Sequence, residues 1–440
     1  MSLIMRDIAY EILSALRLGS VPAVGVAELA VGRQAELGEL EHQLDFAGQG
    51  KSALKFISGD FGSGKSFLCA LLRERAFERG FASSTVVVSP DAPLGKLDVL
   101  IGKTFDGFRL PEKRTACGLS DLLEKWLLDL LKKISMLEGL SLGEPKAIAR
   151  LHTIAMDKIQ EELSAVRGLE ASFANAVKSY LQARLKRDNQ LASDVLGWLR
   201  GSRNLATSRK NQIGVKGDVT PLAALNYIKG LLTILRSTGG AGLVWIIDEV
   251  ETVQRLPNSR QRENSFESLR VLVDLVAENA FPGLMLIVTG TPQLFEDPRY
   301  GIPSYEALKD RINRISFPDG SYSFRQPILT LSGFDLNLLL QVAERIRKLH
   351  SLAFDWHAEE RLTDVHLGRL AEMAVSAFGG HVERTPRVFL REVVNICDML
   401  HEHPSLSADE YFRDDKIIAA RLASPESHYT EPQNANRSLL

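Results

Sequence analysis

A glycine-rich turn between an apolar run and a helical run restricts the fold of this chain more than any other part of its sequence. Residues 59–66, which read GDFGSGKS, satisfy the pattern G-x-x-x-x-G-K-[ST] at every fixed position. The run 54–58 before them predicts a strand, and the periodic apolar run 67–77 after them predicts a helix. Such a loop lets consecutive backbone amides point at a phosphate, and the helix adds the positive end of its dipole. The sequence therefore predicts a phosphate-binding loop within a strand–loop–helix unit.

The residue types in the loop have expected roles in binding a nucleoside triphosphate. The Lys65 ammonium is expected to reach the β- and γ-phosphates, and the Ser66 hydroxyl is expected to bind Mg²⁺. We expect the other contacts from the backbone of the loop and of the residue that follows it. The predicted nucleotide-binding residues of this segment are Gly59, Asp60, Phe61, Gly62, Ser63, Gly64, Lys65, Ser66 and Phe67.

A second motif supplies a pair of carboxylates. The continuous apolar run 242–247 predicts a buried strand, and Asp248 and Glu249 follow it directly. Asp248 can hold Mg²⁺ through water, and Glu249 is placed to take a proton from an attacking water. This general-base role favours hydrolysis over small-molecule kinase chemistry, because a kinase has no need to activate water. The sequence contains no Asn/Thr-Lys-x-Asp motif, which a GTPase would need to recognise guanine.

Apolar strand candidates alternate with helical segments along the first three quarters of the chain. The candidates are 54–58, 85–88, 242–247 and 284–288. This alternation predicts an α/β fold with a doubly wound parallel sheet that helices cover on both faces. Thr289 and Thr291 follow the last of these strands, and we expect one of their hydroxyls to contact the γ-phosphate or the attacking water.

The 440 residues exceed what one such sheet requires, and the helical patterns locate the surplus. Lys65 and Asp248 are much further apart than a strand and its crossovers require, so we expect a helical insertion at about 93–221. Helical periodicity returns at 336–349, with Ser332 or Asp335 as its N-cap, and again at 358–378 and 387–400. The predicted domains are an N-terminal helix and linker at 1–30, a nucleotide-binding core at 31–325, a helical lid at 326–402 and a C-terminal tail at 403–440.

The composition excludes several other classes of protein. Lys and Arg number 53 against 55 Asp and Glu, a net charge of −2, so the total charge indicates neither nucleic acid nor a membrane surface as a partner. The three cysteines, Cys69, Cys117 and Cys397, have no short spacing, which disfavours a disulfide framework or a zinc site. No apolar run has the length needed to span a bilayer. We therefore expect a cytoplasmic protein without a membrane partner.

The predicted insertion departs locally from this neutrality. Between residues 184 and 216, eight basic and two acidic residues give a local charge of +6, with Trp198 among them. One interpretation is a surface that follows the phosphate backbone of duplex DNA, and the alternatives are a solvated helical face or the site of a protein partner. The basic residues are Arg184, Lys186, Arg187, Arg200, Arg203, Arg209, Lys210 and Lys216.

A short histidine motif near the C-terminus invites a metal-site interpretation. In His401-Glu402-His403, the spacing does not place both histidines on one face of a helix. We expect a surface turn at this position and no metal site.

The order of these motifs resembles that of AAA+ ATPases of the origin-recognition type. Val31-Gly32-Arg33, followed by Glu36 and Leu37, resembles the segment that lies over the adenine in that family. The resemblance implies that Thr289 or Thr291 is sensor 1. It implies that Arg311 or Arg314 is an arginine finger that projects into a neighbouring subunit's site. Arg387, in Thr385-Pro386-Arg387, would be sensor 2 of the lid, with Arg384 as the alternative. The resemblance covers residues 31–92 and 222–400.

Within this group, the layout and length are similar to those of the ATP-binding proteins of BREX phage-defence systems. The resemblance implies an ATP hydrolase that uses ATP and Mg²⁺ and couples turnover to conformational change in a homo-oligomer. It also implies other phage-defence proteins, and possible duplex DNA, as partners. The alternative is a nucleotide-gated switch or scaffold that holds ATP, hydrolyses it slowly and recruits protein partners without binding DNA.

Overall fold

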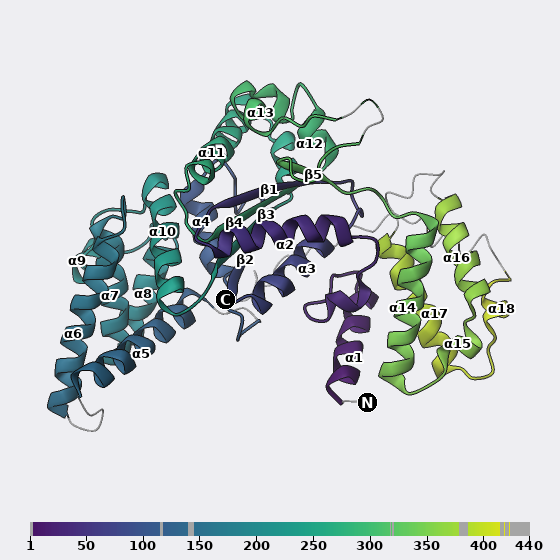
Figure 1. Ribbon diagram of the computed structural model, residues 1–440, viewed down its shortest axis with the longest axis horizontal. Coiled ribbons are helices and arrows are strands. Elements are labelled where there is room, and N and C mark those ends of the chain that lie inside the picture. The colour runs from purple at the N-terminus through teal and green to yellow at the C-terminus, as the bar shows by residue number, and fades with distance from the viewer. Residues whose placement is uncertain are drawn as a thin grey trace, which may run out of the picture. The chain divides into compact units, whose positions relative to one another are not determined.

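The computed structural model describes residues 3–114, 118–139, 145–316, 318, 321–377, 386–413, 418 and 422. These residues form two compact units, whose elements are labelled in Figure 1. The first, which we call the sheet unit, comprises Ala35–Ser58 and Leu72–Thr330. The second, which we call the helical unit, comprises the described residues of Met1–Gln34, Gly59–Leu71 and Leu331–Leu440.

A parallel sheet organises the sheet unit. The described strands pair in the order β2-β3-β4-β1-β5, and every pairing is parallel. Both β4 and all but the last residue of β3 are completely buried, which is typical of strands in α/β proteins. The predicted α/β class and its parallel sheet are therefore confirmed. The strands are β1 (Ala53–Ser58), β2 (Phe81–Val87), β3 (Gly242–Asp248), β4 (Leu284–Gly290) and β5 (Ile328–Thr330).

The strand ends differ from those expected from residue preferences. The second strand begins at Phe81, before the expected start at Thr85, because it pairs in register with β3 from Phe81↔Gly242 to Val87↔Asp248. Pairing thereby includes Ser83 and Ser84, whose intrinsic strand preference is low. At their other ends, β3 extends through Asp248 and β4 through Thr289 and Gly290. The acidic residue and the threonine are thus parts of neighbouring strands.

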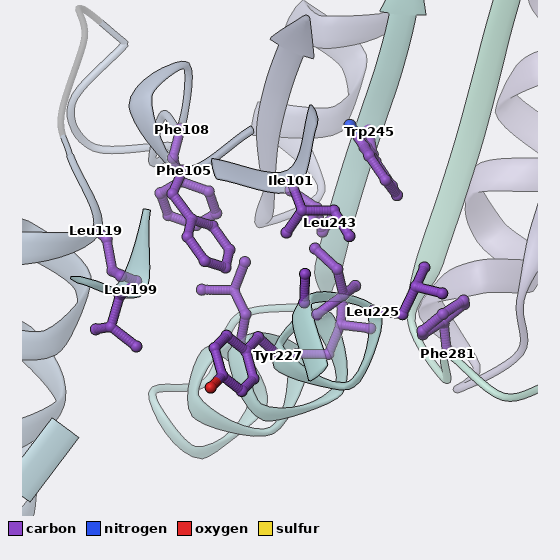
Figure 2. Close-up of a cluster of buried hydrophobic side chains, with 14 of the residues drawn as sticks. Ile101, Phe105, Phe108, Leu119, Leu199, Leu225, Tyr227, Leu243, Trp245 and Phe281 are labelled. Atoms are coloured by element: carbon purple, nitrogen blue, oxygen red, sulfur yellow. The ribbon is translucent and has the colours of Figure 1, made fainter. Parts of the chain in front are cut away.

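Helices fill the predicted insertion, and their core is continuous with that of the sheet. In Figure 1, α5 to α9 stand together as a bundle, and α10 leads from it into β3. Figure 2 shows Phe105 of α4, Tyr227 of α10 and Leu243 of β3 in one buried cluster. The insertion therefore packs as part of the sheet unit. Its helices are α4 (Leu97–Asp106), α5 (Leu119–Glu138), α6 (Pro145–Ser164), α7 (Ala171–Leu185), α8 (Asn189–Leu199) and α9 (Thr207–Ile213), and α10 (Pro221–Ser237) follows them.

The remaining helices of the sheet unit precede its first strand or connect its strands. The helix that follows the phosphate loop, α3 (Lys65–Glu78), starts in the helical unit and continues into the sheet unit. The others are α2 (Gln34–Gly48), η2 (Val250–Arg255), α11 (Ser259–Ala277), α12 (Pro292–Glu296), η3 (Ile302–Ser304) and α13 (Glu306–Ile312).

Helices from both ends of the chain build the helical unit around a second apolar core. Asp335 caps α14 by accepting a hydrogen bond from Leu338 N at 2.8 Å, so Asp335 and not Ser332 is the N-cap. The expected single helix at 358–378 is wrong, because the backbone leaves the helical conformation at Leu362 and a new helix begins at Asp364. None of the described helices is long and apolar enough to cross a membrane. The elements are α1 (Leu3–Arg17), η1 (Val26–Leu29), α14 (Leu336–Phe354), α15 (Ala358–Arg361), α16 (Asp364–Ala377), α17 (Pro386–Glu402) and α18 (Ala408–Tyr411).

Candidate functional site

The phosphate loop, residues 59–66, starts directly after β1 and ends in the first turn of α3. Gly62 and Gly64 have φ angles of 85° and 94°, which side-chain-bearing residues rarely adopt. A Cβ on Gly59 would lie 2.4 Å from Ser63 Oγ, so the loop's own packing excludes a side chain there. The backbone of the loop therefore depends on its glycines, as the motif predicts.

The Lys65 ammonium of the loop binds the loop's own backbone, whereas the Phe61 and Ser66 side chains are exposed. Lys65 is buried, and its Nζ donates to the carbonyls of Gly59 at 2.5 Å and Asp60 at 3.1 Å. The exposed Phe61 ring has its centroid 5.5 Å from the same ammonium. Ser66 is exposed in the first turn of α3. The loop thus carries one cation that can exchange its two carbonyl partners for phosphate oxygens.

The donors of the loop fit a phosphate, and the oxygen atoms available fit Mg²⁺. In the described part of the chain, no backbone carbonyl accepts from Gly64 N–H, and Ser63 Oγ is buried without a hydrogen-bond partner. The first amides of α3 add further donors, because the first turn of a helix leaves its N–H groups unpaired. Ser66 offers a hydroxyl and Asp248 a carboxylate, which are the hard oxygen ligands that Mg²⁺ prefers.

The acidic pair lies at the end of β3 in a conformation that the sequence does not reveal. Glu249 has φ 58° and ψ 41°, in the left-handed region, which costs a side-chain-bearing residue about 1 kcal/mol. Its N–H donates to Asp248 Oδ1 at 3.0 Å, and its side chain is exposed. Residues held in such backbone conformations cluster at functional sites. The turn directs the two carboxylates differently although they are adjacent in sequence.

Thr289 contacts this acidic pair. Its buried hydroxyl donates to Asp248 Oδ1 and accepts from Glu249 N–H at 3.2 Å. Thr291 is also buried, but it is the N-cap residue of α12 and its side chain makes no capping hydrogen bond. Of the two threonines, the structure therefore brings Thr289 next to the carboxylates.

The segment 31–33 lies against the phosphate loop within the helical unit. Val31 is buried in the apolar core of that unit, and a Cβ on Gly32 would lie 2.3 Å from Leu338 Cδ2. The buried Arg33 donates from one terminal nitrogen to the carbonyls of Ser63 at 2.8 Å and Ser332 at 2.7 Å. The guanidinium thus contacts the loop's backbone, a contact that no pattern in the sequence indicates.

The candidate finger arginines differ in their partners. Arg311 is exposed at the end of α13, and its guanidinium pairs with Asp274 of α11. Arg314 is half-buried, donates to Thr330 Oγ1 at the end of β5, and lies 4.7 Å from the ring centroid of Tyr322. It also lines a cavity of about 180 Å³ together with Ser58 and Thr330. Arg387 is exposed in the first turn of α17, and Arg384 lies outside the described residues.

A buried lysine in β1 was missed by the sequence interpretation. Lys55 in β1 is 1% exposed, and its Nζ donates to the carbonyls of Phe324 at 2.6 Å and Gln326 at 2.8 Å. It also pairs with Glu39 of α2 at 2.8 Å. Burial lowers the pKa of Lys55, and the Glu39 carboxylate opposes that effect. The available signal was a single charge within an otherwise apolar strand, which indicates a buried partner.

Carboxylates pair with five of the eight basic residues between residues 184 and 216. Lys186, Arg187 and Lys216 are exposed and have no ion-pair partner among the described residues. Trp198 is buried, and its Nε1 donates to Gly217 O at 3.1 Å, so its ring belongs to the core. The paired residues are Arg184 with Glu124, Arg200 with Asp106, Arg203 with Asp98, Arg209 with Asp194, and Lys210 with Asp218.

The histidine motif is not the turn that the sequence suggested. His401 and Glu402 complete the last turn of α17, and the His401 ring packs 5.3 Å from that of Trp356. The helix formed by the preceding residues continues to Glu402, although the polar residues of the motif favoured a turn. Among the described residues, no group of three or more His, Cys, Asp or Glu side chains is arranged to hold a metal ion.

The comparison with known families covers nearly the whole chain. Residues 4–416 match the model of a family described as BREX system ATP-binding protein BrxC/D. No curated protein matches the sequence. The family match confirms the resemblance to BREX ATP-binding proteins that the motifs and layout suggested.

Proposed function

The chain belongs to the family of BREX system ATP-binding proteins BrxC/D, and from this premise we propose that it is a Mg²⁺-dependent ATP hydrolase of phage defence. The observation that carries the proposal is the hydrogen-bonded cluster of Asp248, Glu249 and Thr289 at the ends of β3 and β4. A protein that only held ATP would have no need for a carboxylate on a strained turn beside a second carboxylate and a buried hydroxyl. The phosphate loop supplies donors for the phosphates of ATP.

Each group has a role that its chemistry supports. Amides of the loop and the Lys65 ammonium bind the phosphates, while Ser66 and Asp248 hold Mg²⁺. Bound Mg²⁺ neutralises negative charge on the phosphate oxygens. The Glu249 carboxylate accepts a proton from the attacking water. The Thr289 hydroxyl orients Asp248 and the turn at Glu249, and in this role it is the sensor 1 of the AAA+ resemblance.

The proposal extends to an assembly of AAA+ type. An arginine, Arg311 or Arg314, acts on the nucleotide of a neighbouring subunit in a homo-oligomer, and Arg387 acts from the helical lid as sensor 2. Hydrolysis then changes the arrangement of subunits. The partners are other phage-defence proteins in the cytoplasm, and the insertion at about 93–221 is the surface for duplex DNA. In this assembly, each subunit has a nucleotide-binding core at 31–325, built on a doubly wound sheet, and a helical lid at 326–402.

One observation favours a second candidate, a slow nucleotide-gated switch. Lys65 is bonded to the carbonyls of Gly59 and Asp60 in its own loop, so a bound triphosphate has to displace both contacts. A rearrangement on binding is what a switch requires, and hydrolysis then serves only to reset it. In this candidate the output is recruitment of a protein partner.

The substitution Glu249→Gln separates the two candidates. If Glu249 is the general base, the variant should bind ATP within about threefold of the wild type while its turnover falls by about 10²- to 10⁴-fold. Glu263→Gln, at an exposed glutamate of α11, is the matched control and should leave turnover unchanged. ATP binding by calorimetry and phosphate release should be measured on the same samples. Unchanged turnover in Glu249→Gln would remove this residue from the mechanism, and tight binding with negligible wild-type turnover would favour the switch.

A further inference from the structure

Arg33 occupies a position in the helical unit that couples three separate segments. It lies between η1 and α2 and is 4% exposed. One terminal nitrogen donates to Ser63 O in the phosphate loop and to Ser332 O in the segment before α14. Its guanidinium carbon is 5.4 Å from the centroid of the Phe334 ring. Burial of a guanidinium is favourable only where its N–H groups find acceptors, and these two carbonyls accept from one of its terminal nitrogens.

The bond to Ser63 O has a consequence for the next residue. A trans peptide is planar, and its C=O and N–H point in opposite directions. Arg33 holds the Ser63 carbonyl towards itself, so the N–H of Gly64 in the same peptide plane points away from Arg33. In the described part of the chain, no backbone carbonyl accepts from that N–H. A phosphate loop binds its ligand through N–H groups in this position.

We propose that Arg33 is a positioning residue, which fixes the Ser63–Gly64 peptide plane so that Gly64 N–H is oriented for the β-phosphate before the nucleotide binds. The inference rests on the proposed nucleotide site and deepens it. It differs from the role that the family resemblance implies for the segment 31–33, namely contact with adenine. Gly64 has a φ angle of 94°. Because glycine is the least restricted residue, its backbone could also adopt many other orientations. The hydrogen bond from Arg33 therefore restricts a peptide plane that glycine alone would leave free to rotate.

The same guanidinium also ties the loop to the segment that leads into α14. Ser332 is 299 residues from Arg33 in the sequence, and Ser63 is 30 residues from it. The loop, the N-terminal segment and the start of α14 thus share one hydrogen-bonding centre within the helical unit. Removal of the guanidinium frees the peptide plane at Ser63 and leaves the Gly64 N–H without a fixed direction.

The test compares ligands that share different parts of ATP. Binding of ADP, AMP and pyrophosphate to the wild type, Arg33→Met and Arg33→Lys should be measured by calorimetry on the full chain. Arg33→Met should weaken ADP and pyrophosphate by about 10- to 100-fold, the range expected when a hydrogen bond from a charged group is lost. AMP, which lacks the β-phosphate, should change by less than about threefold. Arg33→Lys retains a donor for Ser63 O and should recover part of the loss.

The outcomes separate this inference from its alternatives. An equal loss for AMP and ADP, with pyrophosphate unaffected, would mean that Arg33 contacts adenine and would overturn the inference. Unchanged ADP and pyrophosphate binding would also overturn it. A wild type that binds none of the three ligands would instead contradict the proposed function. Arg345→Met is the control, because Arg345 donates to Glu28 O at 3.0 Å in the same unit without contacting the loop. If Arg33→Met does not fold, the ADP-to-AMP affinity ratio of Arg33→Lys still decides the question.

Discussion

The hydroxyl of Thr289, at the end of β4, donates a hydrogen bond to Asp248 Oδ1 at the end of β3. The Thr289 hydroxyl oxygen also accepts a hydrogen bond from the N–H of Glu249, whose backbone is left-handed. Because β4 lies between β1 and β3, Thr289 stands between the strand that leads to the phosphate loop and the strand that carries the acids. One buried hydroxyl therefore fixes both the direction of the Asp248 carboxylate and the turn at Glu249.

We predict that Thr289→Val slows ATP hydrolysis and leaves ATP binding intact. Valine keeps the shape of threonine but leaves Asp248 Oδ1 and Glu249 N–H without their shared partner. Loss of a hydrogen bond to a charged group costs about 1.5–3 kcal/mol, which corresponds to a 10- to 100-fold lower rate if the loss is felt in the transition state. Steady-state phosphate release and ATP affinity should be measured together.

Thr291→Val provides the comparison for this prediction. Thr291 is buried at the start of α12, two residues further on, and its side chain makes no capping hydrogen bond. Its replacement should change the rate less than Thr289→Val does. The reverse order of effects would show that Thr291, and not Thr289, is the sensor of the γ-phosphate.

Local signals were sufficient for the fold class and the central motifs. The phosphate loop, the acidic pair and the apolar strands are each written in a short stretch of sequence, so pattern and composition located them. The strand ends were less predictable. Ser83 and Ser84 join β2 because distant segments, above all β3, provide backbone partners, which a local preference cannot indicate.

Contacts between distant residues were not accessible to the same reasoning. Arg33 meets Ser332, and Arg203 meets Asp98, across 299 and 105 residues. The basic residues between 184 and 216 show how such distant contacts affect a prediction from local charge. Counting charges along the chain gave +6, but most of its carboxylate partners lie outside the counted window. The local excess was therefore an overestimate of the charge that solvent or a partner meets.

We predict that Arg311, and not Arg314, acts on a neighbouring subunit. Arg314 is held at its own β5 by Thr330 and by the Tyr322 ring, whereas Arg311 forms an exposed ion pair with Asp274. An exposed pair contributes only about 0–1 kcal/mol, so Arg311 can be redirected to a partner at low cost. Mixing Arg311→Ala with Glu249→Gln, two inactive variants, should restore part of the ATPase rate, because each subunit supplies what the other lacks.

The corresponding mixture with Arg314→Ala serves as the control. If Arg314 acts within its own chain, adding Glu249→Gln subunits should restore no activity to Arg314→Ala. Restoration in the second mixture alone would assign the trans role to Arg314. Particle size should be measured for each mixture, because a protein that stays monomeric with ATP contradicts the trans mechanism for both residues.

For the insertion, we predict that any duplex DNA binding depends on Lys186, Arg187 and Lys216. These exposed residues have no ion-pair partner among the described residues, so their charge is available to phosphates. Their replacement by glutamine should weaken binding and reduce the salt dependence, by up to about three in the slope of log K against log salt. Fluorescence anisotropy with a duplex at several salt concentrations measures both quantities.

The paired residues supply the contrast for that experiment. Charge reversal at Arg203 would place a carboxylate beside Asp98, so a loss of binding there would not separate recognition from misfolding. Unaltered DNA affinity in the triple glutamine variant would contradict the DNA interpretation of the insertion. It would favour the alternatives, a solvated face or a protein partner.

The last prediction concerns a half-buried ionic centre in the helical unit. The Asp398 carboxylate accepts two hydrogen bonds from Arg17, each of 2.7 Å, and one from His350 Nε2 at 3.0 Å. Trp356 Nε1 donates to the other ring nitrogen of His350 at 2.9 Å, which leaves the proton of a neutral ring on Nε2. Burial acts to raise the pKa of Asp398, but the bonds from Arg17 and His350 outweigh it and lower that pKa to about 2.

This shift makes the free energy of unfolding depend on pH in a defined direction. The pKa of Asp398 is lower in the folded than in the unfolded chain, so its contribution is complete above about pH 5 and falls as the pH is lowered towards 2. The full contribution is about 2 kcal/mol, and roughly half of it should be lost between pH 5 and pH 3. The difference in unfolding free energy between the wild type and Asp398→Asn, from urea titrations at each pH, should shrink by about 1 kcal/mol over that range. A wild-type-to-Asp398→Asn difference that stays constant with pH would mean that Arg17 and His350 do not stabilise the ionised form.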